Sequence, residues 1–274
     1  MLSINAQRFN EQKLGRAQAK WKAQCYEKVL EGNEGIISCP FRFGVPVDFI
    51  ESKKTVMLVG QEARGLTCDY ETWDSLSKQE SIDDDGEIVS TCDYAKWSIP
   101  RMQKWVIEYT ERQLGIGEHK EIAFNGSPFW RFARALKANG YFPCWNNLEK
   151  ITQYNGATEH RLKCDDEGYA WRRILNEKVS PFDQSLLQRE IELTKPDIVV
   201  FVIGPKDPYW SSLAYAFDID KYIIADHRPT PDMPCVDITN CLGLNMPRTY
   251  WTFHPQFLSR NGLFKRVIEE ITQS

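Results

Sequence analysis

The sequence predicts an α/β protein, a three-layer α/β/α sandwich around a central, mostly parallel four-stranded sheet. Segments with helical spacing of apolar residues alternate along the chain with short, continuous apolar runs. Such runs are typical of parallel strands that are buried on both faces. They end in glycine, Asn-Asn, glycine and His-Pro, so turn-forming or polar residues stand at the strand ends.

Four segments have the character of core strands. "KTVMLVG" predicts a strand at 55–59, and "YFPCWNNL" predicts one at 142–148. "KPDIVVFVIG", at 195–204, is the clearest strand, and "RTYWTF", at 248–253, is the last one. "KYIIAD", at 221–226, is expected to be a short edge strand.

Apolar periodicity and end signals predict helices between these strands. Ser127 can cap a helix that begins at Pro128 and ends before Gly140. The other predicted helices span 7–31, 98–114, 182–194, 207–217 and 255–272.

The chain is expected to form a single domain over residues 1–274. It carries an N-terminal helical extension at about 1–50 and an insertion at about 66–121. The acidic stretch "SIDDDGEIVS" in the insertion predicts a solvated turn, because a calcium loop needs alternating acidic positions and a distant Glu.

The composition argues against some classes of function. The net charge of −4 argues against a protein that coats nucleic acid non-specifically, although one local basic face stays possible. The N-terminal stretch has no apolar core of a signal peptide, and no apolar run is long enough for a membrane span. We therefore expect a cytoplasmic protein that does not contact a membrane.

The eight cysteines lack C-x-x-C spacing, so reduced thiols are expected. An iron–sulfur cluster built from scattered cysteines is the less favoured alternative. We expect neither a cofactor nor a bound metal.

The strand ends indicate where a ligand-binding site should lie, because ligands of open α/β sheets bind outside the carboxyl ends of the strands. Four segments should meet there: "GQEARG", "WNN", "GPKDP" and "HPQ". In their order along the chain they resemble the uracil-DNA glycosylase superfamily. That superfamily has a G-Q-D-P or G-E-A-P-G motif after strand one, a base-reading Asn after strand two and a His-Pro-Ser-like motif before the last helix.

The counterparts in this chain are "VGQEARG" (59–65), "WNNLEKI" (145–151) and "FHPQFLSR" (253–260). The resemblance covers roughly residues 55–65 and 122–270. Three departures suggest a divergent member: Ala63-Arg64 replaces the proline of the first motif, Gln256 replaces a serine, and Glu62 stands where one branch has an aspartate.

The resemblance implies a uracil-DNA glycosylase-like fold and a role for each matched residue. Glu62 and His254 would be catalytic: the carboxylate would orient a water and stabilise the cationic sugar, and the imidazole would donate to the departing base. Asn147 would read the base edge, with Asn146 as the competing candidate because the register is open. Phe129 would stack on a flipped base, with Phe124 as the alternative.

The remaining candidates for substrate binding are Gly60, Gln61 and Pro255, and those for nucleic-acid binding are Arg64, Arg260 and Lys265. The predicted function is that of a DNA glycosylase-like hydrolase, which cleaves the N-glycosidic bond of uracil or a related damaged base. The expected partner is single- or double-stranded DNA with a damaged base. The alternatives are a base- or nucleotide-binding protein of the same fold without turnover, and a hydrolase of free nucleosides or nucleotides.

Overall fold

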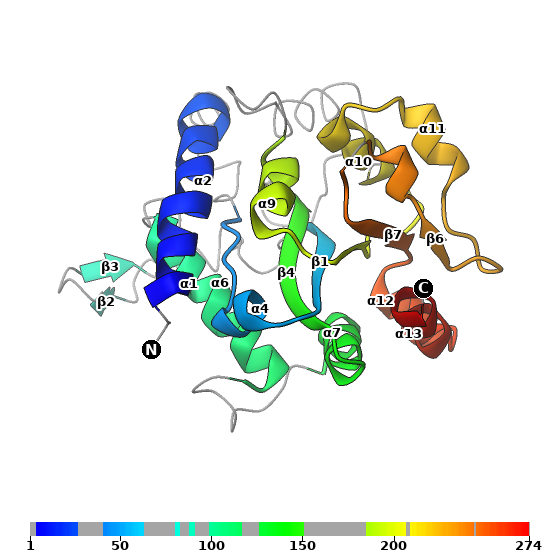
Figure 1. Cartoon of the computed structure of the whole chain (residues 1–274), viewed down its shortest axis with the longest axis horizontal. Coiled ribbons are helices and arrows are strands. Elements are labelled where there is room, and N and C mark those ends of the chain that lie inside the picture. The colour runs from blue at the N-terminus through cyan, green and yellow to red at the C-terminus, as the bar shows by residue number, and fades with distance from the viewer. Residues whose placement is uncertain are drawn as a thin grey trace.

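The computed structural model shows one central sheet with helices on both faces (Figure 1). It describes residues 4–26, 41–62, 80–82, 88–90, 99–116, 126–150, 185–206, 209–243 and 245–273.

The sheet has five strands in the order β4-β1-β5-β7-β6. Their bounds are β1 Thr55–Glu62, β4 Phe142–Glu149, β5 Ile198–Phe201, β6 Cys235–Asp237 and β7 Arg248–Thr252. The pairs β1–β4, β1–β5 and β5–β7 are parallel, whereas β6 runs antiparallel to β7. The four core strands and the mostly parallel sheet are thus confirmed, but the expected strand number of four is wrong. The fifth strand escaped prediction because it has only three residues and follows Pro234, which is typical of an edge.

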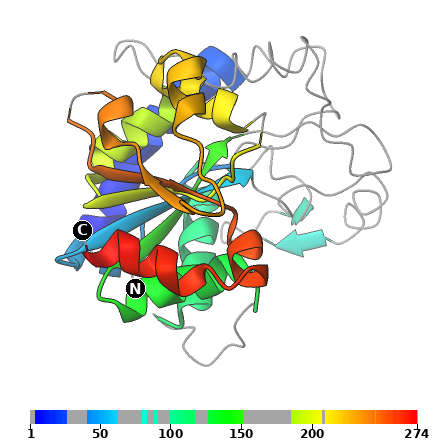
Figure 2. The ribbon, with the colours of Figure 1, turned by 90° about the vertical axis from the view of Figure 1, so that its right-hand side faces the viewer.

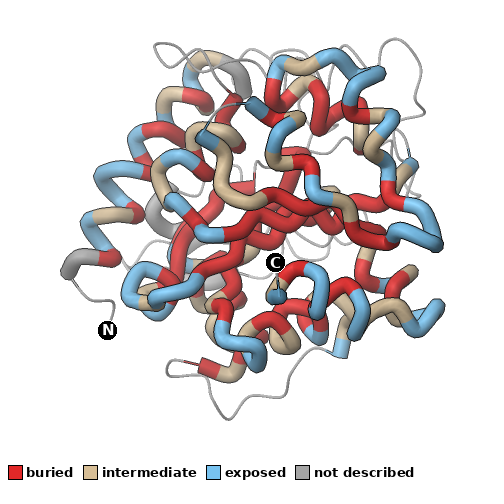
Figure 3. Tube along the Cα trace, turned by 45° about the vertical axis from the view of Figure 1, so that its right-hand side comes forward, coloured by how far each residue is buried: buried red, intermediate tan, exposed pale blue. Residues whose placement is uncertain are grey.

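Helices cover both faces of the sheet, as Figure 2 shows. One face packs against α9 (Leu186–Thr194) and α10 (Tyr209–Phe217), and α2 (Gly15–Trp21) packs against α9. The other face packs against α7 (Pro128–Ala138), α12 (Pro255–Arg260) and α13 (Phe264–Gln273). Buried residues follow the sheet and the inner faces of these helices (Figure 3).

The remaining elements lie around this core. They are α1 (Ile4–Arg8), the π-helical turns η1 (Phe9–Leu14) and η2 (Lys22–Tyr26), α4 (Val47–Glu51), the antiparallel pair β2 (Glu80–Ile82) and β3 (Ile88–Ser90), α6 (Ile99–Leu114), α11 (Lys221–Asp226) and the 3₁₀ turn η4 (Thr239–Cys241). The acidic turn predicted between β2 and β3 lies outside the described residues. None of the helices in the described part of the chain is long and apolar enough to cross a bilayer.

Two predictions about secondary structure are wrong. "KYIIAD" forms α11 instead of an edge strand, because the Asp220 side chain accepts the Tyr222 N–H and caps a helix. The last helix is divided into α12 and α13 at Asn261-Gly262. Gly262 has a φ of 67°, and the Leu263 N–H bonds to the Leu258 carbonyl, which ends α12.

The helix start at Pro128 is confirmed, since the Ser127 side chain accepts the Trp130 N–H. Residues of the N-terminal extension and of the insertion also enter the core of the sheet. Leu14 of η1 and Val106 of α6 are both buried in the cluster that contains Met57 and Val59 of β1.

The segment 41–46 lies very close to α6 at Gly44. A Cβ placed on Gly44 would lie 2.7 Å from the Gln103 carbonyl oxygen and 3.0 Å from Ile107 Cγ1. Because a helix backbone cannot yield, Gly44→Ala should lower the free energy of unfolding by about 1–3 kcal/mol in a denaturant titration. Gly126→Ala is the control, since a Cβ there meets nothing within 4 Å. Equal effects of the two variants would contradict the close packing.

Candidate functional site

The carboxyl ends of β1, β4, β5 and β7 lie at one edge of the sheet, because these strands are all parallel. From β1 the chain moves to β4 on one side and then to β5 on the other. Such a reversal of strand order is where open α/β sheets bind ligands. The structure therefore brings the four nominated strand ends to the expected edge.

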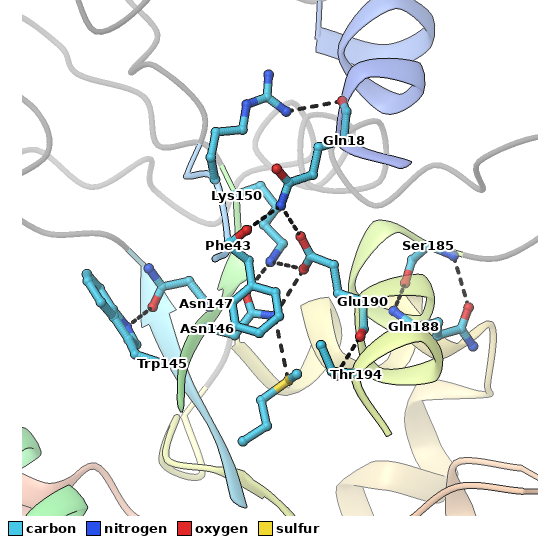
Figure 4. Close-up of polar contacts among 12 residues, drawn as sticks. Gln18, Phe43, Trp145, Asn146, Asn147, Lys150, Ser185, Gln188, Glu190 and Thr194 are labelled. Atoms are coloured by element: carbon cyan, nitrogen blue, oxygen red, sulfur yellow. Dashed lines mark hydrogen bonds and ion pairs between the residues drawn. The ribbon is translucent and has the colours of Figure 1, made fainter. Parts of the chain in front are cut away.

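The two asparagines of β4 point to opposite faces of the sheet, as successive strand residues do. Asn146 forms hydrogen bonds with Lys150 and Glu190 on the α9 side. Asn147 lies on the α7 side, where its Oδ1 accepts the Trp145 indole N–H at 3.1 Å (Figure 4). Asn147 is thus the asparagine that lies with the other candidate binding residues.

Asn147 lies against Gly60 and near Phe129. In the parallel register Gly60 pairs with Asn147, and a Cβ on Gly60 would lie 2.8 Å from Asn147 Oδ1. The same Cβ would lie 3.7 Å from Cε2 of Phe129, a half-buried residue in the first turn of α7. A glycine is needed at residue 60 because any side chain would displace the amide. Phe124, the alternative stacking residue, lies outside the described residues.

The side-chain nitrogen of Asn147 is a buried hydrogen-bond donor that lacks an acceptor in the described structure. Nδ2 is buried, and among the described residues it has no hydrogen-bond partner. A buried donor without an acceptor costs about 1–3 kcal/mol. An acceptor atom placed beside Nδ2 would recover this energy.

His254 is the N-cap of α12, and Pro255 takes the first helical position. The His254 Nδ1 accepts the Gln256 backbone N–H at 3.2 Å. An acceptor at Nδ1 requires the proton of a neutral imidazole to lie on Nε2, so Nε2–H is the donor. Gln256 contributes only its backbone N–H to this contact, and the residue itself is exposed.

The end of β5 supports His254. Gly204 has a φ of 73°, and a Cβ on it would lie 3.7 Å from the His254 backbone nitrogen. The Trp251 indole donates to the Gly204 carbonyl at 3.1 Å, and Gln61 Nε2 donates to the Ile203 carbonyl at 2.5 Å. The Gln61 side chain therefore connects β1 with the end of β5, a contact not foreseen from the sequence.

The site residues form two groups on different strands of the sheet. Asn147, Gly60 and Phe129 form one, and His254 with the end of β5 forms the other. The strands that carry Asn147 and His254 are three spacings apart, about 14 Å. A ligand that contacts both side chains has to lie across β1 and β5.

The structure gives less information about the other predicted site residues. Glu62 is the last residue of β1, but only its backbone belongs to the described part of the structure, and Arg64 lies outside it. Arg260 is exposed at the end of α12. Lys265 is exposed on α13 and pairs with Glu269 at 3.5 Å.

A buried polar network lies on the opposite face of β4 (Figure 4). The Lys150 ammonium bonds to the Glu190 carboxylate at 2.6 Å and to Asn146 Oδ1. Gln18 Nε2 donates to the other Glu190 oxygen at 3.0 Å and to the Phe43 carbonyl at 2.8 Å. These contacts join α2, the segment before α4, β4 and α9.

Burial lowers the pKa of the Lys150 ammonium, and the Glu190 carboxylate opposes that shift. Both side chains are almost completely withdrawn from water. A buried cation of this kind depends on its counter-ion and hydrogen bonds. The pair therefore constrains where α9 and the end of β4 lie.

The sequence interpretation missed Lys150 and Glu190. The signal for Glu190 was its position on the apolar stripe of α9, three residues after Leu187 and one before Ile191, both buried. A charged residue on such a stripe indicates a buried partner. Lys150 stands directly after the strand and carried no signal of its own.

Two cysteines, Cys144 and Cys235, are buried in the described part of the structure. Within the described ranges, no cluster of three or more His, Cys, Asp or Glu side chains has the geometry of a metal site. Burial raises the pKa of the Cys144 and Cys235 thiols well above the ordinary value. These thiols stay protonated and are poor nucleophiles and ligands.

Comparisons with known proteins do not identify a family. Neither the scan against protein-family models nor the search of curated proteins found a match for this chain.

The Lys150–Glu190 pair can be tested by a double-mutant cycle. Lys150→Met should lower the free energy of unfolding by about 3–5 kcal/mol, because it leaves a buried carboxylate without its cation. Adding Glu190→Gln should recover part of that loss, since a neutral amide can stay buried. Denaturant titration measures both.

The surface pair Lys265–Glu269 provides the matched control, with the corresponding Met and Gln substitutions. It should show no measurable coupling, because exposed pairs contribute little. Strictly additive effects of the buried substitutions would contradict an ion pair that constrains the fold.

Proposed function

We propose that this protein binds a nucleobase at the carboxyl edge of the sheet and cleaves its N-glycosidic bond in DNA, in the manner of uracil-DNA glycosylases. One observation carries the proposal. Within the described structure, the buried amide of Asn147 has an Nδ2 donor without a hydrogen-bond partner, and its Oδ1 faces Gly60, which lies near the half-buried ring of Phe129. A flat heterocycle with an acceptor atom matches a hydrogen-bond donor and an aromatic ring better than a flexible or charged ligand does.

The imidazole of His254 supports the chemical step. Its Nδ1 is occupied by the Gln256 N–H, so Nε2 presents a proton while the ring is neutral. When the bond between sugar and base breaks, the bonding electrons leave with the base, and a donor aimed at the base oxygen stabilises that charge. Water then forms a bond to the sugar carbon, and the proton that it loses neutralises the released base anion.

Glu62 has the proposed role of the carboxylate that positions this water. It stands at the end of β1, which pairs with both β4 and β5. A carboxylate there would also stabilise the oxocarbenium-like sugar. Arg64, Arg260 and Lys265 are the proposed contacts to the DNA backbone, and DNA is the proposed partner.

A second candidate function is hydrolysis or binding of a free nucleoside or nucleotide. The net charge of −4 favours it, because a long polyanion gains affinity from broad basic surface. Deoxyuridine and uracil-containing DNA, offered in parallel, separate the two functions.

Base release from labelled single- and double-stranded DNA tests the proposal. The strands carry one uracil, one hypoxanthine, or a thymine opposite guanine, and alkali reveals abasic sites. His254→Asp should reduce the rate about 100- to 1,000-fold, because aspartate still caps α12 but has no proton for the base. Asn147→Leu, which replaces the amide by an apolar group of similar size, should weaken binding of the base.

His227→Ala is the matched control, because His227 is a half-buried histidine at the end of α11, and its ring bonds to the Ile223 carbonyl of the same helix. It should cleave like the parent. If no substrate yields abasic sites, glycosylase activity on these bases in DNA is excluded. If His254→Asp cleaves as fast as the parent, the activity belongs to another site.

A further inference from the structure

Trp145 stands two residues before Asn147, so both side chains lie on the same face of β4. The Trp145 indole Nε1–H donates to Asn147 Oδ1 at 3.1 Å (Figure 4). This contact is relevant to whether the oxygen or the NH₂ group of the Asn147 amide would face a ligand.

The orientation of the amide follows from the chemistry of its partner. An indole N–H is a donor only, so it can bond to the amide oxygen and not to the NH₂ group. Of the two possible flips of Asn147, one therefore keeps this hydrogen bond and the other loses it. In the retained flip, the oxygen faces Trp145 and Gly60, and the buried Nδ2 is the end without a partner in the described structure.

Trp145 itself is held by an aromatic cluster. Its ring centroid lies 4.8 Å from Phe41, 5.7 Å from Trp130 and 5.9 Å from Tyr109. Rings in such contact from separate elements cannot rotate independently. The indole N–H therefore has a defined direction.

The backbone at Asn147 is also held, from the other face of β4. Its N–H donates to Asn146 Oδ1 at 2.8 Å, and the same oxygen accepts from the buried Lys150 ammonium. Both the main chain and the amide flip of Asn147 are thus determined by its neighbours.

We propose that Trp145 is a positioning residue that decides which base edge the site accepts. It holds the Asn147 amide with Nδ2 toward the ligand, so the site takes bases with a carbonyl acceptor on that edge and rejects bases with an amino group there. Uracil and hypoxanthine belong to the first class, and cytosine and adenine to the second. This inference rests on the proposed function, because it assigns the specificity of the same site.

Trp145→Phe tests the role of the indole, because phenylalanine keeps an aromatic ring but has no N–H. Without that donor the amide can flip and offer its oxygen to an amino group. The preference for uracil over cytosine should fall about tenfold to a hundredfold, the equivalent of one buried hydrogen bond. The readout is the ratio of base-release rates, and of affinities for the two nucleosides, in the full-length protein.

Trp130→Phe is the matched control, because it makes the same change in the same aromatic cluster next to Trp145. It should keep the parent's uracil-to-cytosine ratio. A general loss of packing would lower stability in both variants, but it would not change this ratio in only one of them.

A second readout does not depend on turnover. In an ¹⁵N-labelled protein, the indole signal that is absent from Trp145→Phe belongs to Trp145. Asn147→Leu should shift that signal and speed its exchange with water, because the acceptor is gone. An unchanged signal would show that the hydrogen bond does not exist and would overturn the proposal.

The remaining outcomes distinguish the two proposals. If the parent prefers uracil and Trp145→Phe keeps that preference, the role of Trp145 is wrong and the proposed function stands. If the parent neither binds nor releases any of these bases, the proposed function fails, and the specificity role fails with it.

Discussion

The buried ion pair between Lys150 and Glu190 is the interaction on which the arrangement of this protein depends. It joins the end of β4 to α9, and Gln18 extends it to the N-terminal helix and to the Phe43 carbonyl. A charge in a protein interior is stable only with close partners, so these elements cannot shift separately. The extension and the sheet therefore behave as one packed unit at this edge. An ion pair so placed determines position more than it adds stability.

Because side chains alternate along β4, the two asparagines at its end face opposite sides of the sheet and have different contacts. Asn146 enters the ionic network on one face, whereas Asn147 contacts Gly60 and Trp145 on the other, near Phe129. A shift of one residue in register would exchange the two side chains and place the wrong amide beside Gly60. The parallel pairing of β1 with β4 and the contacts of Lys150 both oppose that shift. Residues on the opposite face of β4, which take no part in the proposed chemistry, therefore help to position the candidate site.

Sequence patterns predicted the elements whose signals are local and strong. The apolar runs predicted the four core strands, and Ser127-Pro128 predicted the start of α7. The predictions of secondary structure were wrong where a single contact decides whether a segment forms a helix or a strand, or where a helix ends. Asp220 caps a helix in a segment whose composition suits a strand, and Gly262 divides a helix whose apolar periodicity continues. β6 is a strand only because β7 is beside it, since three residues have too little pattern to predict their pairing.

Local sequence patterns were enough to predict the α/β class, the core strands and the segments at their carboxyl ends. Those features follow from periodicity and turn chemistry, which act over a few residues. The position of Asn147 instead of Asn146 beside Gly60, and the bond from the Gln256 backbone to the His254 ring, follow from the folded arrangement alone. The tertiary structure also revealed that Lys150 and Glu190 are partners across 40 positions of the chain. Contacts of this kind depend on register and on packing between distant segments, which no local pattern of residues records.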